Sequence, residues 1–216
     1  MRGPSNGSGH RRSIVALDGA ARVPQRFAID WVKLGPDGRF FGADSTRNSD
    51  WHGYGDSVVA VAAGEVVLVQ DGIQENTPLS SRMAVEIDET SATGNTVVVQ
   101  LGTELFAVYA HLRPGSIAVT KGQKVSAGEL LGQLGNSGNS LGPHLHFHLS
   151  TAVAPLAGEG RPFDLEEFRL VGRIESLQSA IRGAPWRVDP ARPGRSVSGE
   201  IPLENMVVEL PTLPGS

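Results

Sequence analysis

The chain has 216 residues, a formal net charge of −4 at pH 7, 27 glycines, 14 prolines and no cysteine. Without cysteine it can form no disulfide, thiolate zinc site or cysteine nucleophile, and its acidic balance gives no basic footprint for nucleic acid. No apolar run approaches 18 residues, so no membrane-spanning helix is predicted, and the frequent glycine and proline favour short elements joined by tight turns.

The N-terminal part alternates between polar and apolar stretches. Residues 1–13 are rich in Gly, Ser and Arg, which predicts a flexible lead-in, and they contain no apolar stretch of the kind found in a secretory signal. Two short apolar stretches follow, Ile14–Leu17 and Phe27–Trp31, with a turn-like Asp18–Gly19 between them. Residues 33–56 are polar and turn-rich, and they predict a long insertion loop of the kind that often carries function.

Regularly spaced segments in the centre of the chain predict the strands of one domain. Runs rich in β-branched residues fill 57–70 and 95–111, each interrupted by a glycine, and further strands are expected over 130–134 and 144–149. No helical pattern lies between these segments. The predicted fold class is therefore mostly β, with an antiparallel core that is closed or nearly so.

The C-terminal residues 153–216 predict an extension that packs on this core. Apolar residues at helical spacing favour a short helix over 174–181, and a connector rich in Pro, Arg and Gly covers 185–199. Residues 206–210 predict a last strand that returns to the core sheet.

Histidines give the strongest chemical signal. His144, His146 and His148 alternate with apolar residues, and because side chains on a strand alternate between faces, the three imidazoles share one face. Neutral imidazole is a good zinc ligand, and two on one strand can present two nitrogens to one ion. The plainer alternative is a polar strand face that is hydrogen-bonded to its neighbours. His111 ends another strand before a turn, where it is either a cap or a member of a site.

Five motifs follow one another in an order that resembles a known family. They are Val58–Val66 (VVAVAAGEV), Gly94–Val98 (GNTVV), Tyr109–Leu112 (YAHL), Val119–Gly132 and Gly135–Phe147, the last of which ends in HLHF. This order resembles the lysostaphin-type zinc endopeptidases, which cut peptidoglycan peptides. The resemblance runs from about Gln25 to Leu149. It implies a lysostaphin-like antiparallel core over residues 14–152, of the duplicated hybrid motif or barrel-sandwich type, with a narrow groove above it.

The resemblance also implies roles for four residues. The family's carboxylate ligand falls on Asp30, and its ligand from the His-x-His pair falls on His146. The two histidines that assist catalysis fall on His144 and His111. One zinc ion would activate a water and polarise the scissile carbonyl, while two imidazoles hold that water or stabilise the developing charge. The implied substrate is a peptide or peptidoglycan, and the implied place of action is extracellular or periplasmic.

One position departs from the family pattern. The family's upstream ligands form His-x-x-x-Asp, and here Arg26 stands at the histidine position. Arginine offers no lone pair, so it cannot ligate zinc, and its guanidinium is expected to pair with Asp30. The third ligand stays open among His10, His52 and Gln25. Alternatively, two ligands bind the metal weakly, or the domain has lost its metal.

A second departure is His148, where the family commonly has an acidic residue; it adds a nitrogen to the site face. Because Asp30, His111, His144 and His146 are all retained, the sequence favours a zinc-dependent endopeptidase acting on peptidoglycan stem peptides or cross-bridges. The alternative is a catalytically degenerate member that binds peptidoglycan or a partner protein and regulates it.

Two weaker motifs have plainer explanations. The glycine-rich residues 132–140 lack the lysine and following helix of a phosphate loop, so they predict a turn-rich wall of the groove whose Asn and Ser side chains bind an extended peptide. Residues 119–131 also resemble lipoyl and biotinyl carrier domains, but Lys121 and Lys124 are misplaced for a carrier lysine, and such a domain leaves the histidines unexplained.

Overall fold

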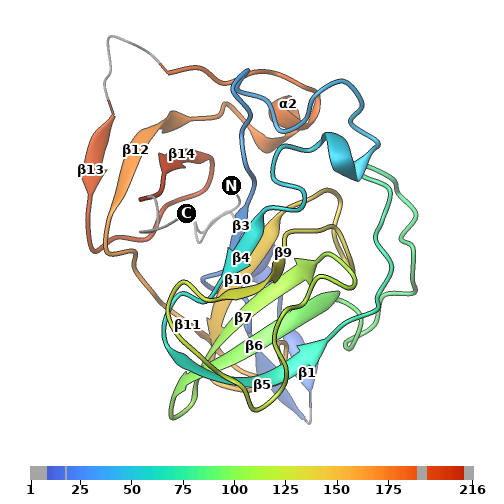
Figure 1. Cartoon of the computed structure of the whole chain (residues 1–216), viewed down its shortest axis with the longest axis vertical. Coiled ribbons are helices and arrows are strands. Elements are labelled where there is room, and N and C mark those ends of the chain that lie inside the picture. The colour runs from blue at the N-terminus through green and yellow to red at the C-terminus, as the bar shows by residue number, and fades with distance from the viewer. Residues whose placement is uncertain (1–8, 18, 189–193, 212–216) are drawn as a thin grey trace.

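The computed structural model describes residues 9–17, 19–188 and 194–211, and over these residues the protein is mostly β (Figure 1). The pairings between its strands are antiparallel, which confirms the predicted fold class. The strands are β1 (Val15–Leu17), β2 (Ala20–Arg22), β3 (Ile29–Trp31), β4 (Ser57–Val59), β5 (Gly64–Gln70), β6 (Asn95–Gly102), β7 (Leu105–Leu112), β8 (Lys124–Val125), β9 (Leu130–Gln133), β10 (Leu145–Ser150), β11 (Gly160–Arg161), β12 (Phe168–Arg173), β13 (Arg195–Val197) and β14 (Met206–Glu209). The helices are α1 (Gly9–Arg12), the 3-10 helix η1 (Asn48–Asp50) and α2 (Leu177–Ile181).

Seven strands form the main sheet, in the order β11-β10-β7-β6-β5-β8 with β3 paired to β10. β6 and β7 are the longest strands and are buried along most of their length. Val97 and Val99 of β6 face the main core cluster, whereas Val98 faces a smaller cluster with Phe106 and Val108. Both faces of these strands are therefore covered, which explains why their apolar runs are continuous instead of alternating.

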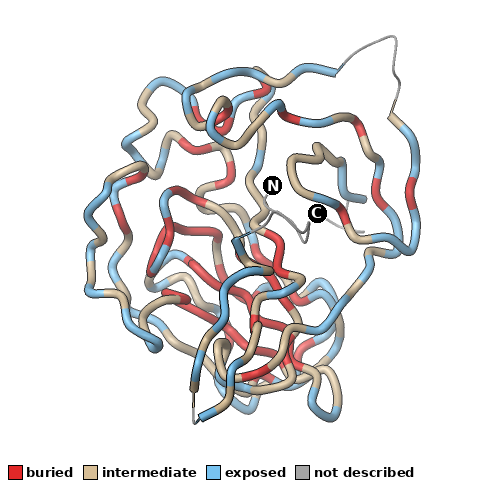
Figure 2. Tube along the Cα trace, turned by 180° about the vertical axis from the view of Figure 1, so that it is seen from behind, coloured by how far each residue is buried: buried red, intermediate tan, exposed pale blue. Residues whose placement is uncertain are grey.

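The separate sheet β4–β9 supplies the other side of the main core. Val58 of β4 and Leu131 of β9 are buried in the same cluster as Val97 and Tyr109. The hydroxyl of Tyr109 is also bonded there, because its Oη accepts a hydrogen bond from the amide of Val61 at 2.8 Å. Figure 2 shows the buried segments gathered in this part of the molecule.

The C-terminal strands form a sheet of their own, in the order β13-β12-β14. The prediction that residues 206–210 return to the core sheet is wrong, because β14 pairs with β12 along Arg169↔Glu209 to Arg173↔Met206. β12 was not predicted, and β13 lies within the expected connector. The alternation of apolar and polar residues over such short strands is too brief to specify a pairing partner. The fold brings β14 beside the edge of β12, and the two strands pair there.

The insertion loop folds against α2, which lies inside the helix predicted over 174–181. Ser176 caps α2, because its hydroxyl accepts a hydrogen bond from the amide of Ser179 at 3.0 Å, and the hydroxyl of Ser179 in turn accepts one from the amide of Ser176. Phe40, Phe41 and Trp51 of the loop share a second buried cluster with Ile174 and Ala180. The division into residues 1–13, 14–152 and 153–216 stays a prediction.

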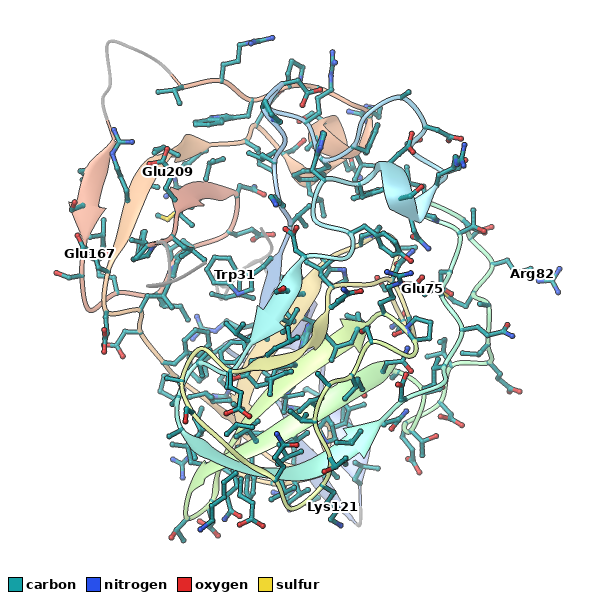
Figure 3. All side chains as sticks on the ribbon, in the orientation of Figure 1. Trp31, Glu75, Arg82, Lys121, Glu167 and Glu209 are labelled. Atoms are coloured by element: carbon teal, nitrogen blue, oxygen red, sulfur yellow. The ribbon has the colours of Figure 1, made fainter. Side chains whose placement is uncertain are left out.

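An apolar groove of about 1020 Å³ separates the core from the C-terminal sheet. Trp31 of β3 lines it and, in Figure 3, points into the space between the core strands and that sheet. Asp30, the preceding residue, therefore lies on the opposite face of the strand, away from this groove. Among the described residues, no helix is long and apolar enough to cross a membrane.

Candidate metal centre and catalytic histidines

Strand β10 carries the histidine segment and lies between β3 and β7. In these antiparallel registers His146 lies opposite Asp30 of β3 on one side and opposite Ala110 of β7 on the other. The ring of His111 lies 4.8 Å from that of His144 and 5.7 Å from that of His146, centroid to centroid. The structure therefore brings together all four residues that the sequence nominated for the site.

His111 reaches the site through an irregularity in β7. The pairing with β6 shifts register between Asn95 and Val97, where β7 holds an extra residue, and His111 has a φ of 63°. For a residue other than glycine, this left-handed conformation costs about 1–2 kcal/mol, so neighbouring contacts must hold it. The amide of His111 donates to the carbonyl of Thr93 at 2.9 Å. The bulge turns an imidazole into the site that a regular strand would direct elsewhere.

The side chain of His111 is held in one tautomer. Its Nδ1 lies 2.8 Å from the carbonyl oxygen of Ser137, and because a carbonyl can only accept, Nδ1 carries the proton. Burial lowers the pKa of His111 well below its usual value, and the neighbouring His144 and His146 lower it further. His111 is therefore neutral near pH 7, with a lone pair on Nε2.

His144 is anchored in the same way. Its Nδ1 donates to the carbonyl of Gly142 at 2.8 Å and lies 3.2 Å from Oγ of Ser140. The other nitrogen, Nε2, lies 3.5 Å from Oδ1 of Asp30. His144 and His111 therefore share one design, in which a backbone carbonyl holds Nδ1 and Nε2 is left for the site.

A chain of hydrogen bonds sets the tautomer of His146. Nε2 of His148 lies 3.2 Å from the carbonyl oxygen of Pro155 and must donate to it, so Nδ1 of neutral His148 is an acceptor. Burial, and then the neighbouring His146, lowers the pKa of His148 well below its usual value, which keeps it neutral. Nε2 of His146, 3.0 Å from that acceptor, must carry a proton. In neutral His146 the lone pair is therefore on Nδ1.

That lone pair faces Asp30. Nδ1 of His146 lies 2.8 Å from Oδ1 of Asp30. Burial alone raises the pKa of Asp30, but the charges and hydrogen bonds of His144 and His146 outweigh it and hold the pKa well below its usual value. An ionised carboxylate against a nitrogen lone pair is unfavourable unless a positive charge lies between them. A proton or a metal ion supplies that charge, and the donor types suit zinc.

A third group completes this cluster. Nε2 of His10, in α1, lies 3.4 Å from Oδ2 of Asp30, and the rings of His10 and His146 are 5.0 Å apart. One ligand atom from each of His10, Asp30 and His146 can be chosen so that all three lie within 4.8 Å of one another. Sequence reasoning had left His10 as one of three open candidates, because nothing in its local sequence links it to residues twenty positions later.

The other residues of the predicted ligand region lie elsewhere. The expected pairing of Arg26 with Asp30 is wrong, because the guanidinium of Arg26 pairs with Glu159 instead, 3.9 Å from its Oε2. A residue at a turn can direct its side chain outward, and this one has an acidic partner there. His52 lies 3.5 Å from Asp37. The side-chain amide of Gln25 approaches His146, but it lies 3.4 Å from Nε2 and not beside Nδ1.

A pocket of about 400 Å³ opens onto these side chains. His10, Asp30, His111, His144 and His146 all line it, together with apolar residues of the insertion loop and of α2. The site is thus accessible to a small group or an extended chain.

The glycine-rich loop over 132–140 is held largely by its own side chains. Asn136, Ser137 and Ser140 are buried and form hydrogen bonds within the protein, whereas Asn139 is exposed and, like Ser140, lines the pocket. Binding of an extended peptide by this loop stays a prediction. Asn76, which sequence reasoning missed, donates to the carbonyls of Asn136, Gly138 and Ser140. It thereby fixes the loop that holds His144.

A glycine is required in the same loop. Gly138 has a φ of 73°, and a Cβ there would clash with the amide nitrogen of Gly94. The close approach places the loop next to the segment that carries Thr93, the partner of His111. The motif GNSGN therefore has a structural role beside His111 and His144.

Comparison with known families decides where the chain belongs. The model described as Peptidase family M23 matches residues 49–163, just over half of the 216 residues. The chain belongs to peptidase family M23. This confirms the resemblance to lysostaphin-type endopeptidases. The M23 match includes His111, His144 and His146, and it begins after Asp30.

Individual relatives of this M23 chain cover smaller parts of it. The peptidoglycan DD-endopeptidase ShyA of Vibrio cholerae serotype O1 (strain ATCC 39315 / El Tor Inaba N16961) is 46% identical over 63 residues, which are 29% of this chain and 14% of ShyA. The chain thus spans a small part of that relative's length.

Solved structures of family members are more distant in sequence. A mutant catalytic domain of the prophage-encoded M23 protein EnpA from Enterococcus faecalis is 24% identical, with a TM-score of 0.37, over 61% of this chain and 92% of that one. The catalytic domain of the antimicrobial peptidase lysostaphin from Staphylococcus simulans is 20% identical, with a TM-score of 0.35, over 60% and 88%. Membership of the family rests on the family model alone.

Proposed function

We propose that this M23 protein is a zinc-dependent endopeptidase that hydrolyses peptide bonds of peptidoglycan, in stem peptides or cross-bridges. The observation that carries the proposal is that Asp30 and His146, as ligands, converge in one pocket with two imidazoles held by backbone carbonyls, His111 and His144. The relative ShyA, named a peptidoglycan DD-endopeptidase, supports peptidoglycan as the substrate. Such a substrate requires action outside the cytoplasmic membrane.

The protein's own groups have distinct parts in this mechanism. Zinc, when bound by Asp30 and His146, supplies a Lewis acid that polarises the scissile carbonyl and acidifies water. With zinc holding the carboxylate of Asp30, Nε2 of either His111 or His144 would accept a proton from the attacking water and return it to the leaving amine. Once protonated, either imidazole donates a hydrogen bond to the charge developing on the carbonyl oxygen. The carbonyls that hold both Nδ1 atoms ensure that Nε2 performs these steps.

The test combines metal content with turnover. Purified protein is dialysed against zinc, its metal content is measured, and it is incubated with purified peptidoglycan and with cross-linked peptide fragments. About one zinc per chain and release of new amino termini are expected. His146→Ala should lose both, and His52→Ala, which changes a histidine outside the pocket, should lose neither. Turnover retained in His146→Ala would exclude this mechanism.

Variants of the two other histidines separate chemistry from metal binding. His111→Ala and His144→Ala should lower kcat by about 10²–10⁴-fold, because each removes a group that transfers protons, while zinc content stays near that of the wild type. Loss of zinc from His111→Ala would instead make that histidine a ligand.

The second candidate function is a catalytically degenerate module that binds peptidoglycan or a partner protein. Arg26 favours it, because the family's ligand histidine is absent from that position. Wild-type protein that sediments with peptidoglycan but neither retains zinc nor releases amino termini would support this alternative.

A further inference from the structure

The proposed zinc site has two ligands from neighbouring strands, β3 and β10, and catalytic zinc sites have three protein ligands with one open position. In the family pattern a histidine supplies the third zinc ligand, and here Arg26 stands at that position. Its side chain is 46% exposed and directed toward Glu159. If the proposed function holds, the third ligand must therefore come from another part of the chain.

We infer that His10, on the N-terminal segment, supplies this third ligand and so replaces the missing histidine. The inference rests on the proposed zinc-dependent function. Zinc bonds of about 2.1 Å in a tetrahedron separate ligand atoms by about 3.4 Å. Nε2 of His10 lies 3.4 Å from Oδ2 of Asp30, and the side chains of both residues are only 14% exposed. His10, Asp30 and His146 thus present one nitrogen, one carboxylate oxygen and a second nitrogen around one point.

The fold explains how a residue so early in the chain reaches the site. The hairpin of β1 and β2, paired from Val15↔Arg22 to Leu17↔Ala20, reverses the chain. The residues before β1 therefore run back alongside those that lead into β3. The guanidinium of Arg11 lies 5.2 Å from the ring centroid of Phe27, a cation–π contact that fastens α1 beside the turn before Asp30.

The remaining candidates do not have this geometry. His52 lies by Asp37 in the insertion loop. The side-chain amide of Gln25 approaches Nε2 of His146, the nitrogen that donates to His148, and not the Nδ1 that faces Asp30. The oxygen and nitrogen of a side-chain amide can be exchanged in assignment. With its oxygen placed toward His146, Gln25 accepts a hydrogen bond from Nε2. Gln25 therefore orients the His146 ring and leaves the ligand position to His10.

A site assembled in this way makes zinc affinity depend on docking of the N-terminal segment. By linkage, the factor by which the docked segment strengthens zinc binding is the factor by which zinc stabilises docking. Cleaving or displacing the segment would remove a ligand without disturbing the strands that carry Asp30 and His146. The segment thus acts as a removable part of the metal centre.

Zinc affinity tests this directly. Competition with a chromophoric chelator gives the zinc dissociation constant of the wild type, His10→Ala, His146→Ala and the matched control His52→Ala. Because His10→Ala removes a direct ligand, we expect its affinity to fall by at least about 100-fold, with His52→Ala unchanged and far-UV circular dichroism the same for all.

The outcomes separate the two proposals. Wild-type affinity in His10→Ala together with loss in His146→Ala would overturn the role of His10 and leave the zinc enzyme standing. A wild-type protein that binds no zinc would overturn the proposed function, and this inference with it.

Proteolysis gives a readout that does not depend on catalysis. The exposed Arg12 is the last residue of α1, so trypsin can cut after it when the segment undocks. Zinc should slow this cut by about tenfold or more in the wild type and have no effect in His10→Ala. Equal protection by zinc in both proteins would show that the segment does not hold the metal, which would overturn the inference.

Discussion

Two regions meet at the pocket, and they are built differently. His111 and His146 stand on long strands buried on both faces, within the main core. His10 stands on a four-residue helix without buried residues, followed by a hairpin of three-residue strands. Because short elements without buried residues open at a smaller free energy than buried strands, we expect α1 and its hairpin to open locally before the core strands do.

This difference indicates which part of the site controls metal binding. The tautomers of His111, His144 and His146 are set by backbone carbonyls and a buried neighbour, so the strands present their lone pairs before any metal arrives. The N-terminal ligand arrives only when its segment docks. Changes in the core should therefore affect the stability of the whole protein, and changes in the segment should affect mainly zinc binding.

The largest effect on global stability is expected in the core. Leu131→Ala should lower the free energy of unfolding by about 2–5 kcal/mol, because it leaves a cavity where the side chain is fully buried. Its neighbour Leu130 is 43% exposed, so Leu130→Ala should change stability by less than about 0.5 kcal/mol. Urea denaturation measures both, and equal effects of the two would contradict the packing described here.

A smaller effect is expected behind the zinc ligand. His148→Leu removes the acceptor for Nε2 of His146 and should weaken zinc binding by about 10–100-fold. His148→Gln keeps an acceptor of similar size and should bind zinc nearly as the wild type does. Chelator competition distinguishes the two variants; if both bind alike, the hydrogen-bond chain through Pro155 does not set the tautomer.

A substitution in the N-terminal segment should weaken zinc binding and leave the fold unchanged. Arg11→Ala removes the contact with Phe27, worth about 0.5–1 kcal/mol, and should weaken zinc binding by about two- to fivefold with an unchanged Tm. The exposed neighbouring arginine provides the control, Arg12→Ala, for which no change is expected. A fall in Tm for Arg11→Ala, with zinc binding intact, would place the segment in the structural core instead.

The smallest effect is expected in the exposed loop that carries Asp88, outside the pocket. Asp88 accepts hydrogen bonds from the amides of Ser91 and Thr90 and from both hydroxyls, which lowers its pKa to about 2. Because the pKa in the folded state lies below the unfolded value of about 4, this stabilisation is present above pH 4 and is lost toward pH 2. A carboxyl NMR titration should show the low pKa, and Ser91→Ala should raise it. A midpoint near 4 in the wild type would contradict the loop geometry.

The main strands and the shared face of the histidines could be predicted from sequence. β5, β6, β7 and β10 lie within or beside the predicted segments, because their apolar runs and glycine interruptions are local properties of the chain. Alternation along β10 likewise placed His146 and His148 on one face, where they are in contact. The family motifs added Asp30, which pairs in register with His146.

Tertiary structure alone decided the rest. β14 joined β12 because a short strand carries too little pattern to choose its partner. The outward turn of Arg26 depends on Glu159, more than a hundred residues later. The approach of His10 to Asp30 depends on a hairpin reversal, and the lone pair on His146 depends on the carbonyl of Pro155. These are contacts between distant parts of the chain, and local sequence patterns carry no record of them.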